Sequence, residues 1–358
     1  MPKAKCRKRG KMLKNALWKI GGVTLGVLAL GLAGCEDKQA APTTAGTDKP
    51  AATAKQKTTA AKKAEAPKPA GYKTGDILKY LPAECPDGRL YARLGDIYGL
   101  KGVAGELGTL QETMVASLGP ESKAKDILKV LQDGGFDPVK TIADTAMCMG
   151  ANEEPVVVAG LNLGKIKDPL ELIATAVEKS GKPKPKIEKE GEIRWMSAGE
   201  KDGVIAMLAP NVIAVAKSKA AVVPLSKAAG AAGFKDAAKS LIWASIKAGK
   251  ATTVDAKLTD KGDNLDIWAA IGMDGPGLDE MKKNPDAFVK QMEQEAAKIG
   301  DEMAKTPFKM LAERVKAAKF AVEGDKAIIT ASVPKTELVA ALKAAGQAKP
   351  EELMGMMR

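Results

Sequence analysis

The 358-residue chain contains no histidine and few aromatic residues, with five Phe, four Trp and four Tyr. Without histidine it lacks the commonest general base, the Ser-His-Asp and Cys-His nucleophile arrangements, and every imidazole metal site. The glycine-rich phosphate-binding motifs and the calcium-loop spacing are also missing. We therefore predict no catalytic residues, no metal site and no cofactor.

The basic charge of the chain is concentrated at its N-terminal end. Lys and Arg number 56 in the whole chain, against 44 Asp and Glu. Residues 1–34 hold eight of the basic residues and no acid, and residues 35–73 hold eight lysines and four acids, which leaves 40 of each sign in residues 74–358. A basic chain often indicates nucleic-acid binding, but here the excess lies outside the main body, and we predict no nucleic-acid partner.

The first 34 residues have the pattern of an export signal. A basic stretch ends at Lys19, and residues 20–32 form an apolar run that contains four glycines. A membrane-spanning helix needs about 20 apolar residues, so this run is too short to span and fits the apolar core of a signal peptide. Either Met1 or Met12 can serve as the start.

The apolar run ends in Leu32-Ala33-Gly34-Cys35. This motif resembles the lipobox that lipoprotein signal peptidase cuts in bacteria. The resemblance covers residues 12–35 and implies that Cys35 receives a diacylglycerol and becomes the first residue of the mature protein. An ordinary secretory leader followed by an incidental cysteine is the alternative.

Lipid on Cys35 would make a membrane the first partner of this protein. Each buried methylene contributes about 0.8 kcal/mol, and one acyl chain alone holds a protein only reversibly, so several chains are needed for stable attachment. The resemblance implies a lipid-anchored protein of the bacterial cell envelope. Glu36 follows the cysteine, and in enterobacteria an aspartate there favours the inner membrane, so we expect the periplasmic face of the outer membrane.

Residues 36–73 have the composition of a flexible tether. They contain Ala, Lys, Pro and Thr in abundance and no Leu, Ile, Val, Phe, Met or Trp. Such a segment cannot bury enough apolar surface to offset its chain entropy. As a flexible coil, its 38 residues would have a root-mean-square span of about 30–37 Å.

Two cysteines remain for the mature fold. Cys6 lies in the leader and Cys35 is assigned to lipid, which leaves Cys85 and Cys148. An exported protein occupies an oxidising compartment, so we predict a structural disulfide between them. A redox pair is the alternative, although no C-x-x-C motif is present.

Turn residues between short apolar runs predict an α+β fold with largely antiparallel sheets and helices on one face. Hairpin turns are expected at residues 260–264 and 323–326, each flanked by apolar or alternating segments. Helices are expected to begin at Asp168-Pro169 and at Pro334-Lys335 and to end at Gly181 and Gly346.

The elements repeat at an offset of 116 residues. The offset aligns Asp168-Pro169 with Asn284-Pro285 and Val212-Ile213 with Ile328-Ile329. We predict two copies of a strand, hairpin, helix, hairpin, helix unit at residues 74–230 and 231–349, followed by a C-terminal tail at 350–358; chance similarity in an Ala/Lys-rich chain is the alternative. Such duplicated units behind a lipobox loosely resemble uncharacterised envelope lipoproteins of Gram-negative bacteria.

The first copy has an insertion at residues 97–140. Its apolar residues recur at helical spacing, and it can form either a helix packed on the sheet or a lid over a ligand. In the second copy, Met281 and Met292 lie on an apolar stripe, for which core packing and an adaptable ligand surface are the two interpretations.

These observations favour a non-enzymatic binding or scaffold protein of the envelope. One alternative is a periplasmic carrier of apolar or lipid ligands, which would use the methionine stripe. The other is a histidine-free hydrolase whose carboxylates or Ser and Lys side chains meet only in three dimensions. An envelope protein or an apolar ligand is the expected partner besides the membrane.

Overall fold

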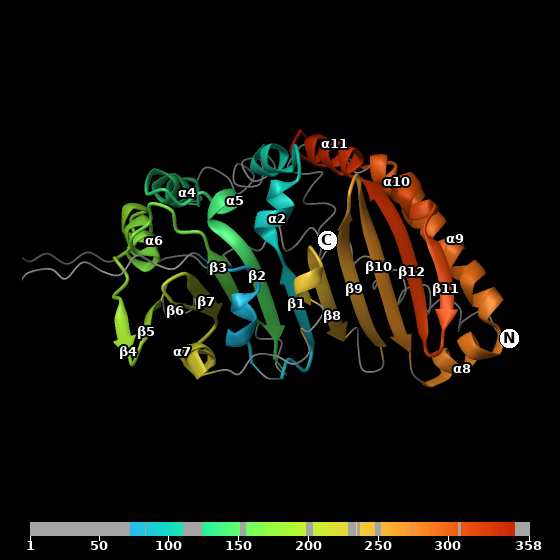
Figure 1. Ribbon diagram of the computed structural model, residues 1–358, viewed down its shortest axis with the longest axis horizontal. Coiled ribbons are helices and arrows are strands. Elements are labelled where there is room, and N and C mark those ends of the chain that lie inside the picture. Colours follow the sequence, from blue (N-terminus) through green and yellow to red (C-terminus); the bar gives the residue numbers. More distant parts are fainter. Residues whose placement is uncertain are drawn as a thin grey trace, which may run out of the picture.

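The computed structural model describes residues 72–82, 84–109, 124–150, 155–197, 203–227, 234, 237–247, 252–273, 275–306 and 309–347 (Figure 1). The leader, Cys6, Cys35, most of the expected tether and the tail at 350–358 lie outside these residues. The described part combines helices with one 12-stranded sheet in which neighbouring strands are antiparallel. The α+β class and the antiparallel sheet expected from the sequence are therefore present.

The sheet runs along the longest axis of the molecule, in the order β11-β12-β10-β9-β8-β1-β2-β3-β7-β6-β5-β4 (Figure 1). The seven strands of the first half are β1 (Gly88–Ala92), β2 (Ile142–Met149), β3 (Pro155–Leu161), β4 (Glu188–Glu190), β5 (Ile193–Ser197), β6 (Val204–Ala209) and β7 (Val212–Ala216). The second half contributes β8 (Ile242–Lys247), β9 (Thr252–Lys261), β10 (Asn264–Met273), β11 (Lys319–Glu323) and β12 (Lys326–Pro334). The two halves join where β1 pairs with β8, with Leu90 opposite Ala244.

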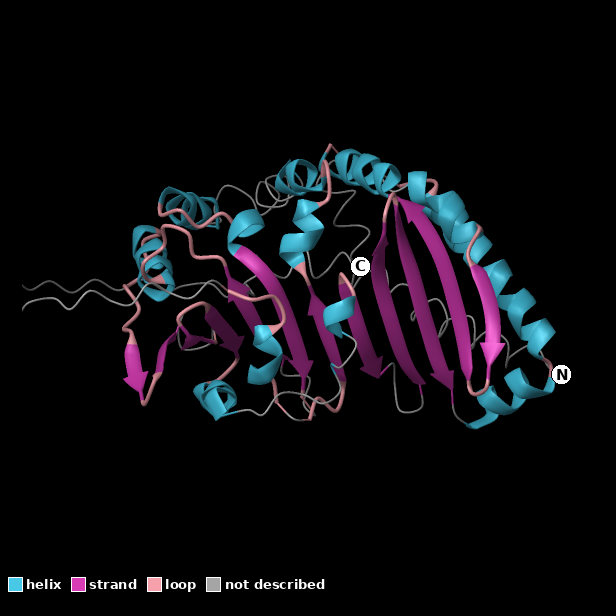
Figure 2. Ribbon diagram, viewed as in Figure 1, coloured by secondary structure: helices cyan, strands magenta, loops and turns pink. Residues whose placement is uncertain are grey.

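The longer helices follow one another along one side of the sheet in the view of Figure 2. They are α2 (Leu94–Gly99), α4 (Ala124–Asp133), α6 (Pro169–Lys179), α8 (Gly275–Lys283), α9 (Pro285–Met303), α10 (Lys309–Lys316) and α11 (Lys335–Gly346), and residues 103–109 are also helical. Shorter helices are η1 (Asp76–Tyr80), α5 (Pro138–Thr141), α7 (Lys219–Val222), η2 (Val223–Lys227) and η4 (Ala237–Lys239).

Helix starts and hairpin turns follow the local sequence. The Asp168 side chain accepts hydrogen bonds from the amides of Leu170 and Glu171, and Asn284 accepts one from Ala287; each cap is followed by proline at the first helical position. The turns of the β9–β10 and β11–β12 hairpins contain Gly262 and Gly324, whose positive φ angles of 70° and 63° suit glycine.

Alternation along the strands gives the sheet two different faces. One face carries Leu90 and Ala92 and is covered by α2, residues 103–109 and α11; we call it the helix face. The same face continues under α6 at one end and under α8 and α9 at the other. The expectation of helices on one face therefore holds for the longer helices.

The opposite face carries Tyr91, Asp144 and Cys148, and we call it the Asp144 face. In the first half it is covered by η1, α7, η2 and η4, which form an apolar cluster with β1, β2, β3, β6 and β7. These short helices were not predicted from the sequence. In the second half this face carries Trp268, Ala270 and Ile328 as well as polar pairs. Lys326 Nζ lies 3.2 Å from Asp255 Oδ2, and Ser332 donates a 2.8 Å hydrogen bond to Asp266.

Within the described residues, no helix has both the length and the apolar character needed to cross a membrane.

Candidate functional site

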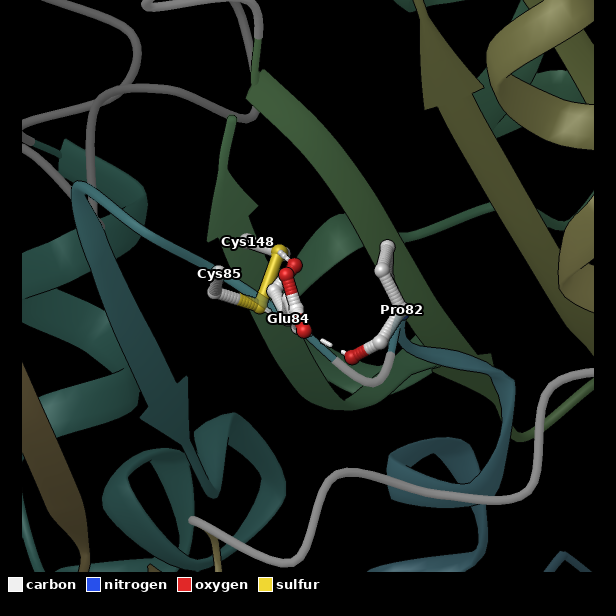
Figure 3. Close-up of a disulfide and its surroundings, with 4 residues drawn as sticks. All are labelled: Pro82, Glu84, Cys85 and Cys148. Carbon is white, nitrogen blue, oxygen red and sulfur yellow. Dashed lines mark hydrogen bonds between the residues drawn. A yellow bond between two sulfur atoms is a disulfide. The ribbon is translucent and has the colours of Figure 1, made fainter. Parts of the chain in front are cut away.

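The chain that enters the fold is fastened to strand β2 at two places, and we treat this attachment as the candidate functional site. The first fastening is the disulfide between Cys85 and Cys148 (Figure 3). Its Cα atoms are 5.2 Å apart, and both cysteines are buried. Carbonyl oxygens of Pro82 and Glu84 lie 3.9 Å and 3.5 Å from the sulfur atoms of Cys85 and Cys148. The disulfide predicted from the sequence is present.

The second fastening is a hydrogen-bonded cluster around Asp144, whose side chain is fully buried. The Tyr72 hydroxyl donates to Oδ1 of this carboxyl. Oδ2 accepts from the Gly75 amide at 2.7 Å and from the Tyr91 hydroxyl at 2.9 Å. Asp144 lies in β2 and Tyr91 in the neighbouring β1, so the cluster joins the incoming chain to the middle of the sheet.

Two glycines make this cluster possible. A Cβ atom at Gly160, which pairs with Asp144 across β2 and β3, would overlap the Tyr72 ring and lie 2.5 Å from Oδ1 of Asp144. Gly75 has a φ of 91°, a backbone conformation that residues other than glycine rarely adopt. In this conformation its amide donates a hydrogen bond to Asp144. The backbone at both positions is therefore shaped to receive the tyrosine and the carboxyl.

Burial raises the pKa of Asp144, Tyr72 and Tyr91. Desolvation raises the pKa of Asp144, and hydrogen bonds from Tyr72, Gly75 and Tyr91 oppose that effect. Burial, reinforced by Asp144, also raises the pKa of Tyr72 and Tyr91 well above the usual range. Both tyrosines therefore keep their protons and remain donors to the carboxyl.

This arrangement suits attachment better than catalysis. Both oxygens of Asp144 are occupied by donors of the protein itself, and the carboxyl has no exposed surface. A general acid or base must reach a proton of its substrate. Among the described residues, no group of three or more His, Cys, Asp or Glu side chains could hold a metal ion.

The other residues singled out from the sequence lie apart from this site. Cys35 falls outside the described residues. Met281 and Met292 are buried in the core between α8, α9 and the helix face. The insertion at 97–140 contributes Leu100, Val103 and Leu107 to the core on the same face, and its residues 110–123 lie outside the described part.

Asp144, Tyr72, Tyr91 and Gly160 were not predicted as site residues from the sequence, and the expected tether was drawn two residues into the fold. Residues 72 and 73 were assigned to the tether, but Tyr72 belongs to the fold through its bond to Asp144. Two signals were available. Tyr72 is the single large apolar side chain between Glu36 and Lys73, and Asp144 is the one charged residue of strand β2, which is mostly apolar.

Comparisons with known proteins assign no family. No protein-family model matches the chain, and no curated protein matches it. Crystal form IV of TP0453 is similar in structure, with a TM-score of 0.42 and 14% identity over 75% of this chain and 96% of the other. Crystal form III of the same protein gives a TM-score of 0.43 and 13% identity over 76% and 99% of the two chains. Similarity at this level carries no functional assignment.

Proposed function

We propose that this chain is a lipid-anchored protein of the bacterial envelope that acts as a tethered, non-enzymatic binding or scaffold module. The anchor is lipid on Cys35, and residues 36–71 form the tether. The basic leader, the apolar run and Leu32-Ala33-Gly34-Cys35 support the anchor. Glu36 favours the periplasmic face of the outer membrane.

Within the described residues, the observation that supports a tethered arrangement is the double attachment of the incoming chain to β2. Tyr72 binds Asp144, and Cys85 is bonded to Cys148, within the first residues after the expected tether. β2 is the seventh of twelve strands, so both attachments reach the middle of the sheet. A protein held to a membrane by its N-terminal end benefits from a strong connection at this point.

The carrier alternative receives less support. A carrier of apolar ligands would need the methionines to line a cavity, whereas Met281 is fully buried and Met292 is 1% exposed in the packed core. The hydrolase alternative needs convergent, reachable carboxylates with perturbed pKa values. Asp144 has a raised pKa, but its hydrogen bonds are already made within the fold.

We also propose that the sheet arose by internal duplication. Outward from the β1–β8 pair, the strand order is β1-β2-β3-β7-β6 in one direction and β8-β9-β10-β12-β11 in the other. The segments that align at an offset of 116 residues occupy matching places in this order, with the capped helix α6 after β3 and the capped α9 following β10. Strands β4 and β5 would then be additions to the first unit.

Metabolic labelling with radioactive palmitate tests the anchor. The wild type is expected to incorporate label and Cys35→Ala to lose it, whereas Cys6→Ala should label normally because Cys6 lies in the leader. Equal labelling of wild type and Cys35→Ala would contradict the proposal.

Cross-linking in intact cells, followed by identification of the neighbours, tests the scaffold role. Recovery of cytosolic proteins alone would count against that role.

A further inference from the structure

The first described residues form a short segment that lies across the Asp144 face. We call residues 72–82 the strap. Ile77 and Leu81 of the strap are fully buried, and its helix η1 contacts β2, β3 and η2. Backbone hydrogen bonds within the strap are local, such as Leu78 to Gly75 at 3.1 Å and Leu81 to Leu78 at 3.4 Å. The strap is therefore not a strand of the sheet.

The fastenings of the strap occur in a fixed order along the chain. Tyr72 and Gly75 bind Asp144 at its start, Ile77 and Leu81 are buried in its middle, and Cys85 follows with its bond to Cys148. Strand β1 begins at Gly88 and is paired on both sides, with β8 and with β2. Any pull from the N-terminal side meets the hydrogen bonds first and the disulfide last.

We propose that the strap opens as a unit before the sheet does, and that the Cys85–Cys148 disulfide stops this opening ahead of β1. The hydrogen bonds around Asp144 and the burial of Ile77 and Leu81 can be lost and regained, whereas the disulfide is covalent. Beyond Cys85, a pull passes directly to Cys148 in β2. Strand β1 then keeps its pairing with β8.

Opening would lengthen the tether. The chain from Tyr72 to Cys85 spans 13 peptide steps, which reach about 43–47 Å when fully extended. That is comparable with the root-mean-square span of about 30–36 Å expected for the 36 residues of the tether. The strap would thus add reach when the anchored protein is pulled away from its membrane. This use of the strap rests on the proposed function, while its separate opening does not.

Amide hydrogen exchange followed by mass spectrometry tests the strap in the full mature chain, residues 35–358 without lipid. The reporters are the amides of Gly75 and Leu78, compared with those of β1 and β10. In the wild type we expect faster exchange in the strap than in β1. Tyr72→Phe should raise strap exchange about tenfold or more, because one hydrogen bond to a buried carboxyl is lost, and should leave β1 and β10 unchanged.

Tyr80→Phe is the matched control, because it removes a strap hydroxyl that lies outside the Asp144 cluster; it should leave strap exchange unchanged. Equal exchange of strap and β1 in the wild type, or a joint rise of both in Tyr72→Phe, would overturn separate opening.

The limit that the disulfide places on opening is tested by amide hydrogen exchange in two samples. One is the folded wild type after reduction, and the other is the variant carrying Cys85→Ser and Cys148→Ser. Exchange of β1 should then rise more than that of β10, because opening can pass residue 85. An equal change in the exchange rates of β1 and β10 would overturn the proposal that the disulfide limits the opening. The chain used carries no lipid, so failure here would leave the anchor standing, and failure of palmitate labelling would leave the strap standing.

Discussion

The hydroxyl of Tyr72 donates a hydrogen bond to the buried carboxyl of Asp144, 72 residues further along the chain. Through this bond Tyr72, the first residue that the structure describes, belongs to the fold. The Gly75 amide and the Tyr91 hydroxyl complete the cluster on the other carboxylate oxygen. Together with the disulfide, the cluster makes β2 the strand that holds the N-terminal end of the molecule.

Replacing Asp144 tests the value of this cluster. Asp144→Ala leaves two hydroxyl groups and one amide without their acceptor, and each buried unpaired group costs about 1–3 kcal/mol. We expect the free energy of unfolding to fall by about 3 kcal/mol, measured by denaturant titration. Asp144→Asn keeps an acceptor and the shape of the side chain, and its loss should be smaller. Equal losses in the two variants would contradict the account.

The protonation of Asp144 predicts a pH dependence. Burial raises the pKa of Asp144 above the ordinary value of 3.8, so the folded protein binds the proton more tightly than the unfolded chain. Its contribution to the free energy of unfolding is complete below that ordinary value and declines as the pH rises through the raised pKa. The stability of the wild type relative to Asp144→Asn should therefore fall as the pH increases from about 4. If the stability of the wild type relative to Asp144→Asn instead rose with pH, the pKa of Asp144 would be lowered in the folded protein.

Gly160 predicts a steric effect at the tyrosine. Gly160→Ala places a methyl group where the Tyr72 ring lies, and we expect a loss of about 1–3 kcal/mol together with faster exchange at Gly75. Gly99→Ala is the matched control, because no atom lies within 4 Å of the added Cβ there. An unchanged stability of Gly160→Ala would show that the ring does not occupy this place in solution.

The point where the chain begins should affect its stability. A chain that starts at residue 71 keeps both Tyr72 and Gly75, whereas one that starts at residue 76 leaves Asp144 with Tyr91 as its remaining donor from the cluster. We expect the shorter chain to be less stable by about 2–3 kcal/mol. Equal denaturant midpoints would mean that the attachment contributes nothing to the fold.

Removal of the disulfide should also destabilise the fold. The link closes a sequence separation of 63 residues, and the loop-entropy model gives about 4 kcal/mol for a loop of that size. Cys85→Ser combined with Cys148→Ser should lower the free energy of unfolding by roughly this amount, whereas Cys35→Ser should leave it unchanged. A double variant as stable as the wild type would show that the disulfide does not restrict the unfolded chain.

The local features of the fold could be predicted from the sequence because they depend on nearby residues. Glycines at 262 and 324 supply the left-handed conformations that the hairpin turns require. Asp168 and Asn284 cap helices whose next residue is proline. Pairing of Cys85 with Cys148 followed from the small number of cysteines, since Cys6 and Cys35 had other assignments.

The long-range features could not be predicted in the same way. Tyr72 and Asp144 are far apart in sequence, and the polar composition around Tyr72 pointed to a tether. The joining of both halves into one sheet depends on the pairing of β1 with β8, which no local pattern specifies. Helices α7 and α11 follow strands at matching places, yet they pack on opposite faces of the sheet. Apolar spacing predicts that a helix is buried but does not say against which face.

The lipid anchor on Cys35 is tested by the intact mass of the native protein, isolated from cell membranes with detergent. We predict a polypeptide that begins at Cys35 and carries the added mass of a diacylglyceryl group on that residue. A native chain recovered from the cytosol, with its leader intact and Cys35 unmodified, would contradict it.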